Sequence, residues 1–474
     1  EDLFSYLLAC SCNEINMPPS ASLMITGVRL ESYYMKELLD KLGIKMDVVS
    51  MGKYKTSFEP FTSNNMSEET REMLSSIVDQ YYNDVIQILR EDRGFTTDTA
   101  ISVIDEGPFT AEKARNSGLV DTLFYEDDLL PYIEKDLPRY IKVVKDYGKV
   151  KKPRPEEINF FSLFFSGQEK QKPQTGKPEI AMVFASGIIV PGARRDYPFQ
   201  EEIIPSDELI GMIEECTEDS SIEAIILRID SPGGSSLASD LIWKSLRKAA
   251  KEKPVIATMS DYAASGGYYI ASGADKIVAH PGTITGSIGV ISGKPVLDEM
   301  FDKIGITPQV ISRGKNSGIF SPSEGFTESG EKALREISTA IYEDFVEKVA
   351  ESRGMPLRAV LKAAQGRVWT GKQAMEKGLV DELGGMEKAI ALAKKMSGIS
   401  PGRTVDVKVY PRQLGVFEFL RDLFGGAGTG LSIPALANNH YARKTLPVAR
   451  LTLYADLMRS EPVLTVLPVL MRVN

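Results

Sequence analysis

Residues 224–235 read AIILRIDSPGGS, and this stretch indicates the fold class. Its first six residues are almost continuously apolar, which is typical of a strand buried on both faces of a sheet. The Pro-Gly-Gly at 232–234 predicts a tight turn that leads directly into a helix near 237–251. The same alternation extends outward to strands at 180–184 and 255–259 and to a helix at 207–216 with Ser206 as its N-cap. Buried strands that alternate with helices predict an α/β fold with a parallel sheet.

An internal repeat organises the chain. Residues 40–55 read DKLGIKMDVVSMGKYK and residues 302–317 read DKIGITPQVISRGKNS, an offset of 262. Further matches keep the same order downstream, where the GLVD of 118–121 returns at 378–381 with an offset of 260. An ordered series of matches over so long a stretch indicates a tandem duplication.

The duplication predicts four parts of the chain. We expect the C-terminal part of a first repeat over 1–135, a linker over 136–177, a second repeat over 178–397 and a tail over 398–474. Counting back with the same offset places the start of the first repeat about 84 residues before Glu1, so we expect this repeat to be truncated at its N-terminus. The linker is basic and contains prolines, which fits either a solvated connection or contact with a membrane surface.

Composition excludes several classes of protein. The chain has 474 residues, of which 43% are hydrophobic, so it can bury a large core. Its 56 Lys and Arg against 65 Asp and Glu give a net charge of −9, which argues against nucleic acid as a partner. Three cysteines make no disulfide framework, no Cys/His spacing resembles a metal site, and we expect no cofactor. The only histidines are His280, which we interpret as structural, and His440, so histidine-dependent chemistry is disfavoured.

Two loops after expected strands carry the candidate chemistry. The glycines at 233–234 let backbone N–H groups point into a cleft, where they can bind a developing oxyanion. Ser265 stands among small residues in AASGGY at 263–268, so a substrate carbonyl can approach its Oγ and the N–H of Gly266. Each loop alone fits an ordinary turn or helix cap, but two of them on adjacent βα units favour acyl transfer. With histidine disfavoured, the remaining base for such a serine is a lysine made neutral by burial.

These motifs resemble those of a known family. RIDSPGG at 228–234, ASGGY at 264–268 and TGSIGV at 285–290, together with GKYK at 52–55, resemble signal peptide peptidase A, a family of Ser/Lys proteases, in its long duplicated form. The resemblance covers both repeats. It implies a fold of the Clp protease/crotonase type, built as a tandem repeat of ββα units.

The resemblance also implies roles for individual residues. Ser265 is implied as the nucleophile, Lys55 as the general base, and Ser287 as a hydrogen-bond partner of the lysine amine. The N–H groups of Gly234 and Gly266 are implied as the oxyanion hole. No metal takes part in this scheme.

The repeat divides these residues between its two copies. The offset of 262 places Ser317 where the first repeat has Lys55, and Leu3 where the second repeat has Ser265. Each repeat therefore keeps one half of the dyad and has lost the other. We expect the two halves to form one site. We favour a site within the same chain, and a site shared between neighbouring copies stays open.

The implied function is that of a serine endopeptidase which cleaves hydrophobic peptides, such as remnant signal peptides in a bacterial membrane. The resemblance further implies a homo-oligomer, expected to be a tetramer, and a membrane anchor ahead of Glu1. It places the protein at the bacterial inner membrane with the catalytic domain on the periplasmic side. Two alternatives remain open: a catalytically inactive scaffold or regulatory homologue, and a crotonase-like acyl-CoA enzyme, which would leave Ser265 and Lys55 unexplained.

Overall fold

The computed structural model describes residues 3–48, 51, 53–135, 177–193 and 203–411, and the backbone of residues 463–466. The predicted linker, apart from its last residue, lies outside these ranges, as do His440 and most of the predicted tail. Within the described ranges, no helix combines the length and the apolar character that a membrane span requires.

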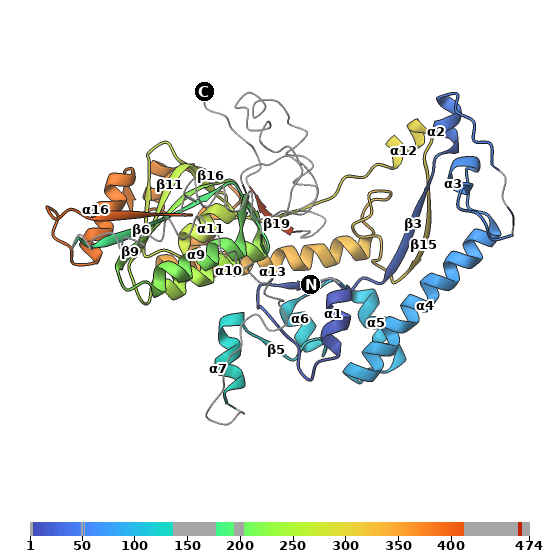
Figure 1. The fold of residues 1–474 in the computed structure, drawn as a ribbon, viewed down its shortest axis with the longest axis horizontal. Coiled ribbons are helices and arrows are strands. Elements are labelled where there is room, and N and C mark those ends of the chain that lie inside the picture. Colours follow the sequence, from blue (N-terminus) through green and yellow to red (C-terminus); the bar gives the residue numbers. More distant parts are fainter. Residues whose placement is uncertain are drawn as a thin grey trace, which may run out of the picture.

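The described elements follow the two repeats in order (Figure 1). The first repeat contains α1 (Leu3–Cys10), β1 (Asn16–Met17), β2 (Ser22–Leu23), β3 (Val28–Tyr34), α2 (Lys36–Lys41), α3 (Glu59–Thr62), α4 (Glu68–Arg93), α5 (Thr97–Glu106), β4 (Phe109–Thr110), α6 (Ala111–Asn116), β5 (Thr122–Leu123), the 3-10 helix η1 (Glu126–Asp128) and α7 (Leu129–Ile133). The second begins with β6 (Glu179–Ser186), β7 (Ile188–Val190), β8 (Ile203–Pro205), α9 (Ser206–Glu218), β9 (Ile222–Ser231), β10 (Gly233–Ser235), α10 (Ser236–Ala249), β11 (Val255–Ala264), α11 (Gly266–Ser272), β12 (Lys276–Ala279), β13 (Ile284–Gly286) and β14 (Ile291–Ser292). It continues with α12 (Asp298–Ile304), β15 (Thr307–Arg313), α13 (Glu328–Arg353), α14 (Leu357–Ala363), β16 (Val368–Thr370), α15 (Gly371–Glu376), β17 (Glu382–Leu383) and α16 (Met386–Met396), and after it come β18 (Asp406–Tyr410) and β19 (Val463–Val466).

The structure confirms the tandem duplication element by element. α4 and α13 are each 26 residues long and lie at an offset of 260. Both begin after a hydroxyl-bearing N-cap residue and end at a glycine in the left-handed region. The antiparallel pair of β2 and β4 has its counterpart in β13 and β16. In each repeat an arginine of the long helix pairs with the aspartate of GLVD, Arg93 with Asp121 and Arg353 with Asp381, both at 2.8 Å.

The second repeat forms an α/β body around one large sheet. β18, β6, β9 and β11 run parallel in this order, and β12 and β13 pair in parallel with successive parts of β11. Alternate side chains of these strands pack against α9, α10 and α11, while the others, such as Ile226 and Ile256, pack against α16 on the opposite face. The predicted parallel sheet, with strands buried on both faces, is confirmed.

Two local details differ from what the sequence predicts. Ser206 is the first residue of α9 rather than its N-cap, and its hydroxyl accepts a hydrogen bond from the N–H of Gly192 at 2.9 Å. Pro205, the last residue of β8, holds the N-cap position, so the strand leads directly into the helix. Residues 406–410, which the sequence places in the tail, form β18 and pair with β6 at the edge of the main sheet.

The two repeats meet in a protruding ribbon. β3 of the first repeat pairs antiparallel with β15 of the second along its whole length, from Val28 with Arg313 to Tyr34 with Thr307. Figure 1 shows this ribbon, with α2, α3 and α12 at its outer end, on the opposite side of the molecule from α11. The first repeat has a separate core, in which α1, α4, α5 and α6 pack together.

Candidate active site

Ser265 lies where β11 ends and α11 begins. β11 runs through Ala264 and α11 starts at Gly266, so a single residue joins strand and helix. That residue has φ 54° and ψ −116°, a conformation that costs about 1–3 kcal/mol for a residue with a side chain. Its N–H donates to the carbonyl of Gly286 and its carbonyl accepts from the N–H of Tyr269, both at 2.8 Å. The strand-to-helix turn therefore fixes the serine in one strained conformation.

The hydroxyl of Ser265 is buried without a hydrogen-bond partner. The residue is 1% exposed, and its Oγ bonds no described residue. Burying a hydroxyl without a partner is unfavourable, and native proteins keep few such groups. A strained serine with an unpaired hydroxyl is the kind of group that can act as a nucleophile, which is the role that the sequence motifs imply for Ser265.

Ser287 is the neighbour of Ser265 across the sheet. β11 and β13 pair in parallel with Ala264 opposite Gly286, and each of these residues is followed by one of the serines. Ser287 also has a positive φ, 49°, and its Oγ donates to the carbonyl of Gly366 at 3.3 Å. It lines an open pocket of about 700 Å³ together with residues of α13 and of the segment after α14. The structure thus brings these two predicted site residues together.

Glycines allow the close packing around the two serines. A Cβ on Gly267 would lie 2.6 Å from the carbonyl oxygen of Ser231, so this position accepts no side chain without a shift. Gly266 is the first residue of α11, where the backbone N–H has no acceptor within its own helix. Gly234 lies in β10, where a Cβ would lie 2.1 Å from the carbonyl oxygen of Ile189 on β7. The predicted open turn at this glycine is therefore a short strand paired with β7.

A buried polar cluster lies behind α11, the helix that follows Ser265. Asp240 on α10 is 1% exposed and accepts hydrogen bonds from Tyr269 of α11 at 3.1 Å and from Tyr125 of the first repeat at 2.9 Å. Lys348 of α13 also donates to Asp240, and it bonds Asp344 at 2.8 Å. Burial alone would lower the pKa of Lys348, but the two carboxylates outweigh burial and raise it, so the lysine stays charged. Through Tyr125 the cluster ties the first repeat to α11.

Lys55 does not reach Ser265 within one chain. Its side chain is exposed in the segment between α2 and α3, and no described residue bonds its amine. Figure 1 shows this segment at the outer end of the ribbon, whereas α11 lies in the α/β body. The meeting of the two halves of the dyad that we expected within the chain is therefore not found in the single chain.

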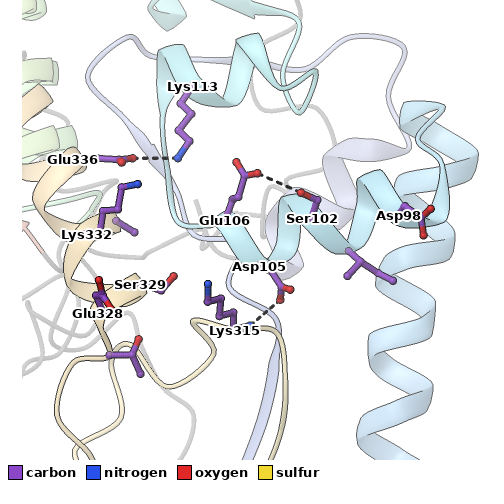
Figure 2. A pocket seen from close by; sticks show the side chains of 13 residues that line it. Asp98, Ser102, Asp105, Glu106, Lys113, Lys315, Glu328, Ser329, Lys332 and Glu336 are labelled. Carbon is purple, nitrogen blue, oxygen red and sulfur yellow. Dashed lines mark hydrogen bonds and ion pairs between the residues drawn. The ribbon is translucent and has the colours of Figure 1, made fainter.

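The junction that the chain does form between its repeats carries Ser317, the counterpart of Lys55. Ser317 follows Asn316, whose Nδ2 donates to the carbonyl of the C-cap residue of α5 at 2.7 Å. Ile25 stands in the first repeat where the second has Ser287. A pocket of about 1050 Å³ beside this junction is lined by lysine and carboxylate side chains of α5, α6 and α13 (Figure 2). This junction offers no serine and lysine at the paired positions, so it has no dyad.

Neither a histidine nor a metal cluster was expected at the site, and His280 lies outside it. His280 is exposed, and its Nδ1 accepts a hydrogen bond from the N–H of Gly282 at 3.2 Å. Among the residues that the structure describes, no group of three or more His, Cys, Asp or Glu side chains could hold a metal ion. His280 bonds its own turn and not the candidate nucleophile.

Comparison with known proteins places the chain in a family. The model of Peptidase family S49 matches residues 4–137 and 247–400, which together make up more than half of the chain. The chain belongs to peptidase family S49. The two matched ranges fall in the first and the second repeat, and they confirm the family that the sequence motifs indicate.

Several relatives of this S49 chain are named as proteases. It is 35% identical to "Serine protease SPPA, chloroplastic" of Arabidopsis thaliana, over 90% of this chain and 61% of the relative. It is 31% identical to "Protease 4" of Haemophilus influenzae, over 82% of this chain and 62% of the relative. The chain thus spans about three fifths of the length of these relatives. Among solved structures, a ClpP1 mutant from Listeria monocytogenes matches with a TM-score of 0.29 and 17% identity, over 44% of this chain and 94% of that chain.

Sequence reasoning missed the polar cluster behind α11 of this S49 chain. Asp240 lies on the buried face of α10, between the buried residues Ala238 and Ile242. A carboxylate on such a face is rarely fully buried unless it is paired, so Asp240 in this pattern was the sequence feature that could have indicated a buried ion pair. Its partner Lys348 lies more than one hundred residues later in the sequence, on a helix whose pattern does not indicate which residues it contacts.

Proposed function

We propose that the protein is a serine endopeptidase with a Ser/Lys dyad, in which Ser265 is the nucleophile and Lys55 the general base. The single observation that carries the proposal is the buried hydroxyl of Ser265, which is held in a strained turn and bonds no described residue. The position of Ser287 beside it and the protease names of the S49 relatives support the same reading.

The proposed reaction begins when the neutral amine of Lys55 takes the proton of Ser265. Oγ then bonds to the carbonyl carbon of the scissile peptide, and the carbonyl oxygen becomes an oxyanion held by the N–H groups of Gly266 and Gly234. The C–N bond breaks as the ammonium of Lys55 protonates the leaving amine. Water gives a proton to the same amine and attacks the acyl carbon. The C–Oγ bond then breaks as the ammonium returns this proton to Oγ, which releases the new carboxyl group and regenerates the serine and the neutral lysine. Ser287 orients the lysine amine through its Oγ.

A lysine can act as the base only in its neutral form, which burial favours. Lys55 is exposed in the single chain, so its proposed role requires a buried setting beside Ser287. The pocket that Ser287 lines offers such a setting.

An extended peptide substrate can pair with the strands beside the site in the place that β19 occupies. β19 lies between β10 and β14 and pairs antiparallel with both. An extended substrate can bind in the same manner, since strand addition supplies main-chain hydrogen bonds whatever the side chains. That the substrates are hydrophobic peptides, such as remnant signal peptides, stays a prediction from the sequence motifs. The tetramer and the location at the bacterial inner membrane stay predictions as well, because the relatives include both bacterial and chloroplast proteins.

Hydrolysis of a hydrophobic fluorogenic peptide by single variants tests the proposal. S265A and K55A should each lower kcat/KM by about 10³-fold or more, because each removes one half of the dyad. The matched control is K36A, which removes another exposed lysine of the same region, one that pairs with Asp40 on α2, and it should leave kcat/KM unchanged. Activity of K55A or S265A equal to that of the wild type excludes the dyad.

The pH dependence of the reaction gives a second readout. Because the base must lose a proton before it can accept that of Ser265, kcat/KM should rise with pH. In S287A the midpoint of this rise should move, since the proposed hydrogen bond to the amine is lost.

A further inference from the structure

One buried carboxylate joins the two repeats. Asp240 of α10 is 1% exposed, and its two oxygens have different partners. Oδ2 accepts hydrogen bonds from the hydroxyls of Ser20 and Tyr125, which both belong to the first repeat. Oδ1 accepts from the hydroxyl of Tyr269 and from the amine of Lys348, which both belong to the second repeat. Asp240 therefore bridges the repeats, with one oxygen bonded to each of them.

The carboxylate of Asp240 is fully satisfied by these partners. An ionised carboxylate offers about four positions for hydrogen bonds, and the donors from the two repeats fill them. The amine of Lys348 also compensates the buried negative charge. Because an unsatisfied buried charge is strongly unfavourable, the carboxylate keeps each donor in place. Neither repeat can shift at this point without the loss of a hydrogen bond.

The first repeat is held against α10 on this side by further contacts. Asp127 pairs with Lys248 of α10 at 2.9 Å. The amine of Lys244, also on α10, lies 4.7 Å from the centre of the Tyr125 ring. Leu237, in the first turn of α10, packs against the core of the first repeat. These contacts fix the position from which the hydroxyl of Tyr125 reaches the carboxylate.

Tyr269 connects Asp240 to the turn at Ser265. Its backbone N–H donates to the carbonyl of Ser265 at 2.8 Å, and its hydroxyl lies 3.1 Å from Oδ1 of Asp240. Its ring is 1% exposed and stacks on the ring of Phe345 of α13, with the two ring centres 4.2 Å apart. One residue thus holds the serine through its backbone and the buried carboxylate through its side chain. A shift of the carboxylate therefore moves the first turn of α11, which holds Ser265.

The two helices that the hydrogen bond joins both begin at candidate site residues. α10 starts two residues after Gly234, and α11 starts at Gly266, directly after Ser265. Asp240 lies in the second turn of α10 and Tyr269 in the first turn of α11, so their bond joins the helices near their N-terminal ends. Donors of an oxyanion hole act only when they lie about 2.7–3.1 Å from the developing charge. The spacing of the two proposed oxyanion donors therefore depends on how these helices are held together.

We propose that Asp240 is a positioning residue, through which the first repeat sets the geometry of the nucleophile and of the oxyanion hole. Tyr125 holds the carboxylate on one side, and the carboxylate holds Tyr269 on the other. The first repeat thereby acts on Ser265 of its own chain. The inference rests on the proposed function and adds to it a contribution of the first repeat that is separate from Lys55.

Removal of single hydroxyl groups tests the inference. Y125F and Y269F each remove one donor of Asp240 and keep the aromatic ring. Each should lower kcat for a hydrophobic fluorogenic peptide by about 10- to 100-fold with little change in KM, because a misplaced nucleophile or oxyanion donor weakens the transition state rather than the bound substrate. The matched control is Y132F, which removes a hydroxyl that bonds the carboxylate of Glu14 within the first repeat, and it should leave kcat unchanged.

Hydrogen–deuterium exchange of α11 gives a readout without a measurement of activity. The amide of Tyr269 is protected by its bond to the carbonyl of Ser265. In Y125F the amides of residues 266–272 should exchange about 10-fold faster, because the carboxylate that holds this helix has lost a donor. In Y132F they should exchange as in the wild type. Fluorescence of Trp243 on α10 shows whether each variant is folded.

The outcomes separate this inference from the proposed function. A folded Y125F protein with the kcat of the wild type, or with wild-type exchange in α11, overturns the inference. An equal loss of kcat in Y125F and Y132F overturns it as well. In Y125F/Y269F the loss of kcat should be smaller than the product of the two single losses, and a full product contradicts one shared network. If S265A hydrolyses the peptide as fast as the wild type, the proposed nucleophile is wrong, whatever the exchange in α11.

Discussion

Replacement of Lys348 by methionine should strongly destabilise the second repeat. Lys348 bonds Asp344 at 2.8 Å and the hydroxyl of Tyr125 at 3.0 Å, and it also donates to Asp240, which is 1% exposed. In K348M the carboxylate of Asp240 stays buried and keeps only hydroxyl donors. Breaking a buried ion pair by removal of one partner lowers the free energy of unfolding by about 3–5 kcal/mol.

The assay is urea unfolding followed by tryptophan fluorescence. Both tryptophans of the chain, Trp243 and Trp369, lie in the second repeat, and the ring of Trp243 is 5.1 Å from the amine of Lys348. The matched control is K113M: Lys113 pairs with Glu336 at 3.1 Å, but both side chains are at least a third exposed. An exposed pair of this kind contributes about 0.2–1 kcal/mol.

The effect of pH on this contribution follows from the pKa of Lys348. The carboxylates raise it above the ordinary value, so the contribution is fully present at neutral pH and is lost only as pH rises through the raised pKa. The double variant D240N/K348M removes the uncompensated charge and should recover part of the lost free energy. If K348M changes the free energy of unfolding by no more than K113M does, the interpretation of the cluster as a buried ion pair is wrong.

Two further predictions concern the turn at Ser265 and the cysteines. G267A should lower kcat/KM by about 10²-fold, because its Cβ would lie 2.6 Å from the carbonyl oxygen of Ser231. The control is G211A on α9, where a Cβ meets nothing within 4 Å, and it should raise the free energy of unfolding by about 0.5–1 kcal/mol. Equal activity of G267A and the wild type would contradict the tight packing at Gly267. Burial raises the pKa of Cys216 to about 11. At neutral pH iodoacetamide should therefore alkylate the exposed Cys12 and leave Cys216 unmodified in the native protein, which peptide mass spectrometry can measure. Equal modification of the two cysteines would contradict the burial of Cys216.

The parts of the fold that the sequence predicts are those with a strong local pattern. The apolar run at 224–229 forms the middle of β9, and the repeat shows that two copies of one unit exist. The pairing of β3 with β15 is different, because the residues that pair are 273 to 285 positions apart and the local pattern at 28–34 indicates no partner. The offset shows which residues are equivalent in the two repeats, but not which segments pair with each other.

The candidate site likewise has features that a local sequence pattern predicts and features that depend on contacts distant in the sequence. Ser265 and Ser287 could be predicted because each lies in a short motif at the end of a strand, and parallel pairing of β11 with β13 brings them together. Their positive φ angles are set by packing at the turn, which no local pattern indicates. Lys55 could be proposed as a residue but not as a position in space, since the sequence does not indicate which surface the segment between α2 and α3 lies on.

Labelling with a serine-directed phosphonate, followed by peptide mapping, tests most directly that Ser265 is the nucleophile. The wild-type protein should carry one label per chain, on the peptide that contains Ser265, and S265A should carry none. K55A should be labelled far more slowly, because the attacking hydroxyl then has no base. A label on another residue, or hydrolysis of the peptide substrate by protein in which Ser265 stays unlabelled, would contradict the assignment.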